Sequence, residues 1–269
     1  MGVVNVTPDS FSDGGRFIDP DSAVAHGERL AAEGAHVLDV GGESTRPGAE
    51  PVPAELERER VVPVVEWLRG AGEPADPVLI SVDTSKAAVA EAALAAGAGM
   101  VNDVTAFRGD PRMAGVVAGS GAGCCLMHMQ GGPRTMQREP RYGQVVSDVK
   151  AFLEERLRFA VAEGVDEERV WLDPGIGFGK TVEHNLELLR RLDEIVALGR
   201  PVVVGASRKS FLGKLTGREV DERLAGTIAA NVLALERGAE VFRVHEVAAV
   251  ADALRVTAAT VGRWTSTSR

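Results

Sequence analysis

Residues 170–181 read VWLDPGIGFGKT, and this stretch decides the fold class of the chain. An apolar segment ends on Asp173, a glycine-rich loop follows, and apolar residues with helical spacing begin beyond it. α/β proteins hold ligands in this arrangement, at the carboxyl ends of parallel strands. The glycines let backbone N–H groups approach a ligand closely.

The loop in this stretch does not match the two common nucleotide-binding loops. The phosphate-binding loop of ATP-binding proteins requires glycine where this chain has Pro174, and the dinucleotide fingerprint requires glycine at the position of Lys180. The sequence therefore favours a site centred on the Asp173 carboxylate over an ATP or NAD site.

The strand–loop–helix unit recurs along the whole chain. The expected strands are residues 2–6, 36–40, 78–83, 100–104, 124–129, 170–173, 201–206 and 241–245. The expected helices include 22–33, 53–69, 85–96, 145–162, 185–198, 221–237 and 246–260. Unbroken apolar runs are typical of strands buried in a parallel sheet. Eight units without a linker predict an α/β fold, a single-domain (β/α)8 TIM barrel over residues 1–262.

A doubly wound open sheet is the alternative fold, because strand order is not written in the sequence. The Ser/Thr-rich residues 263–269 are expected to form a frayed tail. Met1 stands directly before the first strand, so either the natural chain begins further upstream or the base of the barrel is covered differently.

Composition narrows the class of function. The chain is 45% hydrophobic and 26% charged, with no apolar run long enough to cross a bilayer and no secretory leader, which predicts a cytoplasmic protein. A net charge of −9 argues against nucleic-acid binding but not against an anionic substrate, because local charge placement decides that. Cys124 and Cys125 are adjacent, so we expect buried small hydrophobes rather than a disulfide.

Polar and charged residues gather at the expected strand ends, where TIM barrels have their active sites. They are Asn5, Asp39, Asp83, Asn102, Asp103, His128, Asp173, Ser207, Arg208, Lys209, Arg243 and His245. Acids or an amide end strands three, four and six, whereas bases stand at strands seven and eight. This joint pattern favours a functional site over unrelated structural roles.

Several of these residues also have a structural interpretation. Asp83 precedes Thr84-Ser85 and is equally compatible with an N-cap of the next helix. Asp39 and Asp103 are compatible with ion pairs inside the barrel mouth. Lys180 and Arg208 are compatible with solvated loop charges, and His184 is expected to cap the helix that follows it.

The acids and the bases suit two parts of one ligand. Asp83, Asn102 and Asp173 offer acceptors and an amide donor, which suits a flat, nitrogen-rich heterocycle. Lys209, Arg243 and His245 suit phosphate oxygens. We expect the loops after strands one and two to close over both parts.

The motifs that carry these residues closely resemble those of the dihydropteroate synthases of the folate pathway. The matching strings, in family order, are NVTPDSFSDGG, DVGGESTRPGA, SVDTS, VNDV, LMHMQG, LDPGIGFGKT with HN, VGASRKSFLG and RVHEV. The resemblance covers essentially the whole chain. It implies a TIM barrel that joins 6-hydroxymethyl-7,8-dihydropterin diphosphate to 4-aminobenzoate, giving 7,8-dihydropteroate and pyrophosphate. It also implies an Mg²⁺ cofactor, a homodimer and competitive inhibition by sulfonamides.

The resemblance assigns roles to particular residues. It implies that the pterin ring is held by Asp83, Asn102, Asp173 and Lys209, in a slot shaped by Met127, Gly205 and Phe178. It implies that the diphosphate is held by Thr45, Arg243 and His245, that Mg²⁺ is bound by Asn5, and that 4-aminobenzoate is framed by Phe11, Pro47 and Ser207. It also implies that Lys209, Asp13 and Arg46 are catalytic residues. The chain departs from the family pattern at Glu246, where the family usually has aspartate.

Three other functions are compatible with parts of this sequence. A methyltetrahydrofolate-binding barrel shares Asp83, Asn102 and Asp173 but has no need of the STRPG and SRKS motifs. A catalytically silent relative is expected to have lost the motifs of its first two loops, which are whole here. A Schiff-base aldolase would use Lys209 as its nucleophile. For the synthase we expect a dissociative substitution, in which pyrophosphate leaves before the amine attacks.

Overall fold

The structure, a computed structural model, describes residues 1–7, 20–45, 48–70, 78–132 and 135–262. In these residues the chain forms eight parallel strands: β1 Gly2–Asn5, β2 Val37–Gly41, β3 Leu79–Asp83, β4 Met100–Asp103, β5 Gly123–Met127, β6 Val170–Asp173, β7 Val203–Val204 and β8 Val241–Phe242. Strands β1 to β6 pair in chain order in one sheet, and β7 pairs with β8. All of these pairings are parallel.

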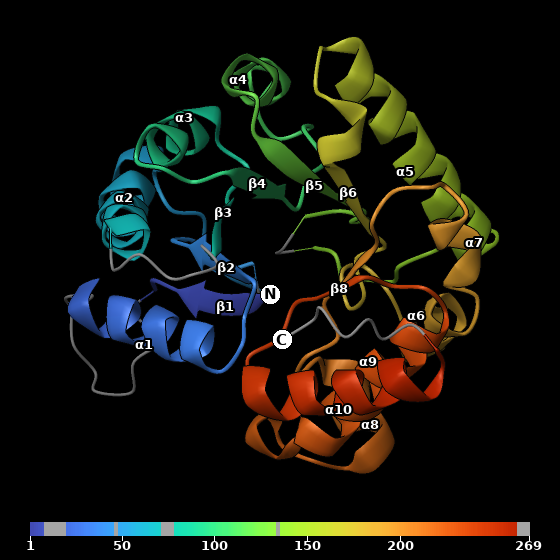
Figure 1. The fold of residues 1–269 in the computed structure, drawn as a ribbon. Helices are drawn as coiled ribbons and strands as arrows, with labels where there is room; N and C mark the ends of the chain where they lie inside the picture. The colour runs from blue at the N-terminus through green and yellow to red at the C-terminus, as the bar shows by residue number, and fades with distance from the viewer. Residues whose placement is uncertain (8–19, 46–47, 71–77, 133–134, 263–269) are drawn as a thin grey trace.

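Two single-residue bridges close the strands into a ring. Leu172 of β6 pairs with Val202 beside β7, and Val244, just after β8, pairs with Gly2 of β1. Figure 1 views the ring of strands from one end of the barrel and shows the helices packed around its outside. The expected (β/α)8 barrel is therefore confirmed, and the open sheet is excluded because its last strand would not pair with its first.

The helices of the described residues fill the outer layer. They are α1 Pro20–Ala32, α2 Ala54–Gly70, α3 Ala87–Ala95, α4 Met113–Ser120, α5 Val145–Ala162, α6 Val182–Arg190, α7 Asp193–Val196, α8 Ser210–Thr216, α9 Leu224–Glu236 and α10 Val247–Thr260. Helix α5 has the expected bounds. The single helix expected over 185–198 is divided into α6 and α7, and it begins earlier because Thr181 and His184 form a capping box. That contact confirms His184 as a capping residue.

Two helices were not singled out from the sequence. Helix α4 reads MAGVVAGS, which has no polar stripe to mark a helical period, and α8 reads SFLGKLT, which is too short to show one. Both end on a glycine in the left-handed conformation, Gly121 and Gly217, which is a common helix stop. The sequence therefore carries the glycine that ends each helix but not the helical period of apolar residues that would predict the helix.

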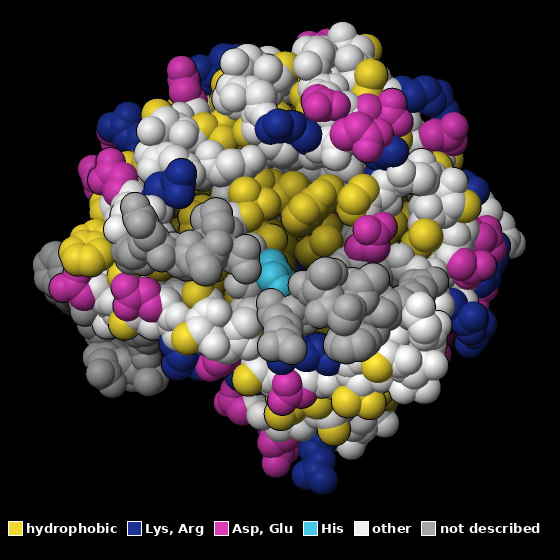
Figure 2. Space-filling model, in the orientation of Figure 1, with side chains coloured by type: hydrophobic (Ala, Val, Ile, Leu, Met, Phe, Trp, Pro, Cys, Tyr) yellow, Lys and Arg dark blue, Asp and Glu magenta, His cyan; other side chains and the backbone are white. Residues whose placement is uncertain are grey.

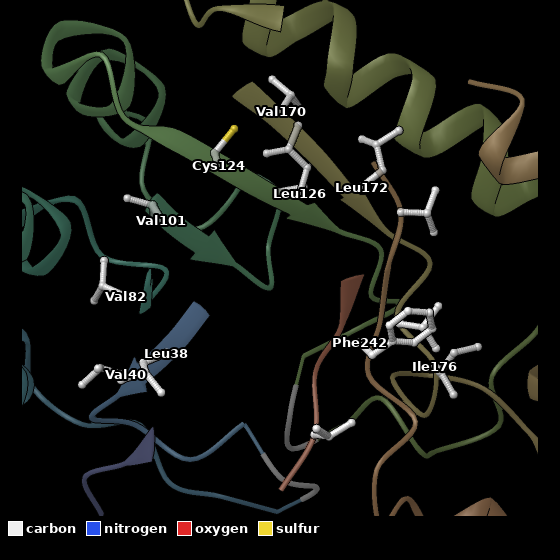
Figure 3. Packing of buried hydrophobic residues seen from close by; sticks show 14 of the residues in the cluster. Leu38, Val40, Val82, Val101, Cys124, Leu126, Val170, Leu172, Ile176 and Phe242 are labelled. Atoms are coloured by element: carbon white, nitrogen blue, oxygen red, sulfur yellow. The ribbon is translucent and has the colours of Figure 1, made fainter. Parts of the chain in front are cut away.

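Alternate side chains of each strand face the helices and form the main hydrophobic core. Figure 3 shows this layer, with Leu38 and Val40 of β2, Val82, Val101, Cys124, Leu126, and Val170 and Leu172 of β6 among its labelled members. Both cysteines are buried free thiols, as expected, and burial raises the pKa of Cys124 to about 12. The other half of each strand faces the interior of the barrel, and many of its side chains are polar.

One expected strand boundary is wrong in a way that bears on the site. The sequence places Asp39 at the end of the second strand, but β2 continues to Gly41 and Asp39 lies in the middle of it. Sequence reasoning treats a carboxylate as the end of a buried strand because burying an unpaired charge is costly. Here the charge is paired inside the barrel, so the strand continues past it.

Hydrophobic and charged side chains occupy different parts of the visible surface. In the orientation of Figure 1, hydrophobic side chains gather at the centre of the visible face, and Lys, Arg, Asp and Glu side chains stand around it (Figure 2). In the described ranges, no helix has the length and apolar character needed to cross a membrane.

The layer between strands and helices is expected to carry much of the stability. Leu172 is fully buried, so Leu172→Ala should lower the free energy of unfolding by about 2–5 kcal/mol. Val256 is 69% exposed, and Val256→Ala should change it by less than about 0.5 kcal/mol. Urea unfolding followed by circular dichroism measures both, and equal losses would contradict the assignment of Leu172 to the core.

Candidate active site

A row of polar residues crosses the carboxyl ends of the first four strands. The register pairs Asn5 with Gly41, Gly41 with Asp83, and Asp83 with Asn102. These residues therefore stand side by side on the inner face of the barrel. Because Gly41 has no side chain, the space between Asn5 and Asp83 stays open; a Cβ at Gly41 would lie 3.3 Å from the Cβ of Asp83.

Arg243 follows β8 and reaches across the interior to this row. Its Nε donates to Oδ2 of Asp39 at 2.6 Å, and one terminal nitrogen donates to Oδ2 of Asp83 at 2.8 Å. Neither β2 nor β3 is a neighbour of β8 in the ring, so the side chain must pass through the barrel. Asp39 also accepts from the Ser81 hydroxyl at 2.7 Å and from Nδ2 of Asn102 at 3.1 Å.

This network changes one expectation about the site. The sequence suggested that the acids and the bases serve separate parts of the ligand, but Arg243 forms ion pairs with two of the acids. Burial lowers the pKa of Arg243, yet the carboxylates of Asp39 and Asp83 outweigh that effect and hold the pKa above its usual range. Arg243 is therefore a cation bound to the acidic wall, and its assignment to the diphosphate stays a prediction.

Asp83 offers an acceptor atom inside the site. Burial raises the pKa of this carboxyl to about 7, against the opposing effect of Arg243. Its Oδ1 is buried and has no hydrogen-bond partner within the described residues. The alternative of an N-cap is wrong, because α3 begins at Ala87 and Lys86 holds its N-cap position. A buried polar atom without a protein partner is compatible with a hydrogen bond to a ligand or to an ordered water.

A second acidic position lies at the end of β6. Asp173 is buried next to Met127 of β5, and its Oδ1 accepts from the Gly175 N–H at 2.6 Å. Burial raises the pKa of Asp173, while the Gly175 N–H and then the charge of Lys209 oppose the rise. Lys209 lies over the Phe178 ring, with Nζ 3.9 Å from the ring centroid. The structure thus brings these residues of β5, β6 and the β7 loop together.

The two acidic positions belong to one interior. Arg243, which binds Asp83, also lies close enough to lower the pKa of Asp173 electrostatically. Met127 and Phe178 pack with Val104, Met129 and Met136 in a small hydrophobic cluster of their own. Gly205 stands opposite Arg243, where an added Cβ would lie 4.0 Å from the Cβ of that arginine. Acidic groups, basic groups and apolar walls therefore share one end of the barrel.

The loops after β7 and β8 are joined by two contacts. The Ser207 hydroxyl lies 2.9 Å from Nδ1 of His245 and also accepts from the His245 backbone N–H at 3.3 Å. Beside it, Arg208 binds the carboxylate of Glu246 and, at 3.2 Å, that of Asp221. Arg208 is therefore an ion-paired residue and not a solvated loop charge. Glu246, the departure from the family pattern, is the partner that holds it.

The remaining predicted residues divide into two groups. Thr45 lines a cavity of about 80 Å³ together with Asp83, Glu57 and Met129, so it borders the acidic row. Phe11, Asp13, Arg46 and Pro47 lie outside the described residues, and their roles stay predictions.

Sequence reasoning misses Ser81 and misinterprets Lys180. Ser81 was not singled out, although it stands two residues before Asp83 and therefore on the same face of the strand. Lys180 was considered as a solvated charge, but it is only 3% exposed. It lies 3.0 Å from Nδ1 of His128, which is also buried. Nothing in the local sequence identifies that pair, because His128 follows β5 whereas Lys180 lies in the loop after β6.

Comparisons with known proteins show the family of this chain. Residues 1–245 match the family described as pterin binding enzyme. The dihydropteroate synthase of Mycobacterium leprae is 47% identical over 275 residues, which cover 98% of this chain and 92% of the relative.

Two solved structures are also similar over most of their length. Xanthomonas albilineans dihydropteroate synthase with 4-aminobenzoic acid has a TM-score of 0.90 at 50% identity, covering 97% of this chain and 92% of that one. The same enzyme in complex with 7,8-dihydropteroate gives 0.86 at 48% identity, with the same coverage of both chains. The chain therefore belongs to the dihydropteroate synthase family of pterin-binding enzymes.

Proposed function

We propose that this chain is a dihydropteroate synthase of folate biosynthesis. It joins 6-hydroxymethyl-7,8-dihydropterin diphosphate to 4-aminobenzoate and releases pyrophosphate and 7,8-dihydropteroate. The observation that carries the proposal is the meeting of Asp83, Asn102, Asp173, Lys209 and Arg243 at one end of the barrel. Its relatives bear the same name and, in the Xanthomonas structures, hold 4-aminobenzoic acid or 7,8-dihydropteroate.

The acidic wall suits the nitrogen-rich edge of a pterin. Oδ1 of Asp83 and the carboxylate of Asp173 accept from ring N–H and amino groups, and these bonds replace the water that burial has removed. Asn102 gives one Nδ2 hydrogen to Asp39, which leaves its Oδ1 acceptor and its second Nδ2 hydrogen for the ligand. Met127 and Phe178 supply flat apolar walls, and Gly205 leaves room for the ring.

The basic side of the site suits the leaving diphosphate. Nδ1 of His245 lies 2.9 Å from the Ser207 hydroxyl, which fixes the ring, and we assign this histidine to a phosphate oxygen. Thr45 lines a cavity that Asp83 also lines, and Arg243 binds Asp83; we assign both to the diphosphate together with His245. Positive charge and N–H donors placed here stabilise the negative charge that develops on pyrophosphate as the methylene C–O bond breaks.

The buried acids have a matching role on the other fragment. Loss of pyrophosphate leaves positive charge on the pterin methylene, and the carboxylates of Asp83 and Asp173 favour that charge electrostatically. The amine of 4-aminobenzoate then forms the C–N bond and releases a proton. An aniline nitrogen needs no strong base for this step. We assign the framing of the aminobenzoate to Ser207 with Phe11 and Pro47, and a role in catalysis to Asp13 and Arg46, as the family resemblance implies.

Mg²⁺ is the proposed cofactor, and the residues present fit it. In the described part of the chain, no three His, Cys, Asp or Glu side chains gather as a metal cage. Mg²⁺ is usually held by few protein oxygens, most often carboxylates, together with waters and substrate phosphates. We propose the amide oxygen of Asn5, which stands opposite Gly41 in the polar row, as a protein ligand here. When bound, the ion supplies charge that stabilises the departing pyrophosphate.

The proposal extends to assembly and location. Leu215 on α8, Leu233 on α9 and Val256 on α10 are each at least half exposed, and these helices lie together on one side of the barrel (Figure 1). These exposed apolar side chains are available for contact with a second copy, and with the family resemblance they support our proposal of a homodimer. We also propose a cytoplasmic location, from the amino-acid composition and net charge of the chain. The proposed partners are small-molecule substrates, with no nucleic acid and no membrane.

A two-substrate assay tests the function directly. The purified chain, given the pterin diphosphate, Mg²⁺ and 4-aminobenzoate, should form 7,8-dihydropteroate and pyrophosphate in equal amounts. Removing Mg²⁺ with a chelator should stop the reaction, because the leaving charge is then poorly stabilised. Absence of dihydropteroate under these conditions would contradict the assignment. Pyrophosphate release without 4-aminobenzoate would support ionisation before amine attack.

Lys209 should be essential for the reaction without being essential for the fold. Lys209→Ala is expected to lower kcat by about 100-fold or more, as removal of an electrostatic stabiliser does. Lys214→Ala, an exposed lysine on the adjacent helix α8, should keep wild-type kcat. Both variants should melt within about 2 °C of wild type. Borohydride should trap no adduct with a carbonyl substrate; an adduct at Lys209 would favour the Schiff-base aldolase.

The raised pKa of Asp83 predicts a pH dependence of pterin binding. Below about pH 7 the free carboxyl is protonated, and it must lose that proton to accept from ring N–H groups. Affinity for 6-hydroxymethylpterin should therefore fall as the pH falls, by up to about tenfold per unit. Calorimetric titrations between about pH 5.5 and 8 measure this change. In Asp83→Asn the affinity should be weaker and the slope lost; an unchanged slope would assign the proton to another group.

A further inference from the structure

Lys180 is a buried lysine to which the proposed reaction gives no role. Burial lowers the pKa of its amine to about 7, and the charge of Asp173 opposes this only in part. Within the described residues its hydrogen bonds go to no carboxylate. A buried amine without a paired acid costs folding free energy, and an apolar side chain would fill the space more cheaply. Stability alone therefore does not explain a lysine here.

The contacts of Lys180 join two separate segments. Its Nζ donates to the Phe178 carbonyl at 3.0 Å, and it lies 3.0 Å from Nδ1 and 3.5 Å from the carbonyl oxygen of His128. Burial lowers the pKa of His128 to about 3, so its ring is neutral and Nδ1 accepts when Nε2 carries the hydrogen. One partner belongs to the loop after β6, and the other to the chain leaving β5.

These two segments lie in direct contact. Gly175 has φ +69°, and a Cβ there would come within 1.9 Å of the His128 carbonyl oxygen. Gly179 has φ +62°, and its Cβ would lie 2.5 Å from the Gln130 carbonyl oxygen. The Tyr142 hydroxyl adds a hydrogen bond to the Gly179 carbonyl at 2.7 Å. We name the contact between residues 174–180 and 128–130 the β5–β6 seam, and Lys180 fills its centre.

The loop on one side of the seam carries pterin-binding groups. The Gly175 N–H binds the Asp173 carboxylate, so a shift of that backbone moves the acceptor. The Phe178 carbonyl accepts a hydrogen bond from Lys180, and the Phe178 ring lies against the amine of Lys209. A displacement of the loop would therefore move an acidic group and an apolar wall of the site together.

We propose that Lys180 is a positioning residue of the pterin site, whose amine ties the β6 loop to the end of β5 and so fixes the Asp173 carboxylate and the Phe178 ring. The proposal rests on the proposed function, because it takes the ligand to be a pterin. Lys180 does not touch that ligand: the loop covers its amine, and the same burial keeps it from acting as a nucleophile.

The test compares Lys180→Met with a matched variant at the other end of the barrel. Met fills the space without donating hydrogen bonds. Arg200 also donates to two backbone carbonyls, those of Gly199 at 2.6 Å and Glu167 at 3.0 Å, but it precedes β7. Arg200→Met therefore removes two similar backbone contacts away from the site, together with an ion pair to Glu168 at 2.7 Å that has no counterpart at Lys180.

The expected result is a selective loss of pterin recognition. Lys180→Met should weaken calorimetric binding of 6-hydroxymethylpterin about tenfold or more and raise the KM for the pterin diphosphate, because misplaced contacts are lost. The KM for 4-aminobenzoate should change less than about twofold, since its site is framed by other loops. Arg200→Met should leave both substrates' KM values and the pterin affinity unchanged.

Three outcomes would decide against the proposal. Wild-type pterin affinity in Lys180→Met overturns it, and so does an equal loss in Arg200→Met, which would indicate a general effect on the fold. If Lys180→Met does not fold, Lys180→Gln is measured instead; its shorter side chain cannot span the seam, so unchanged pterin affinity there also overturns it. A wild-type enzyme that forms no dihydropteroate counts against the proposed function. An active wild-type enzyme, together with unchanged pterin affinity in Lys180→Met, counts against the role of Lys180 alone.

Discussion

The interaction on which the site depends is the fork that Arg243 makes with Asp39 and Asp83 across the barrel interior. Without the guanidinium, two buried carboxylates would face each other in a medium of low dielectric, and without the carboxylates the cation would be unpaired. The pairing also lets a charged residue occupy the middle of β2. An acidic wall inside a barrel is possible here because the opposing strand supplies the counter-charge.

Around that fork the site is built from loops that hold one another. On one side the β5–β6 seam fixes the position of Asp173, and on the other Ser207 and Arg208 bind the loop after β8. Active-site groups carried on loops are held less firmly than groups on strands. Contacts between neighbouring loops compensate for this, because each loop is fixed by a rigid strand and also by its neighbour.

Sequence reasoning recovered the order of the strands and of most helices, because the strands are short apolar runs and most helices carry a helical period of apolar residues. Helix α5 is the clearest case, and its bounds match the expectation. The failures have physical causes. Helix α4 is apolar on all sides, so no stripe marks it. The last two strands are shorter than expected, because flanking residues such as Val202 and Val244 make only isolated bridges.

The sequence by itself determined the fold class, the ends of the strands where chemistry gathers, and the family, since these depend on local patterns and ordered motifs. Only the tertiary structure decided which charges meet. Arg243 and Asp39 are separated by 204 positions in the chain, and Lys180 and His128 by 52. No local pattern records such pairs, because barrel closure and burial decide which side chains lie within hydrogen-bonding distance and which must find a partner.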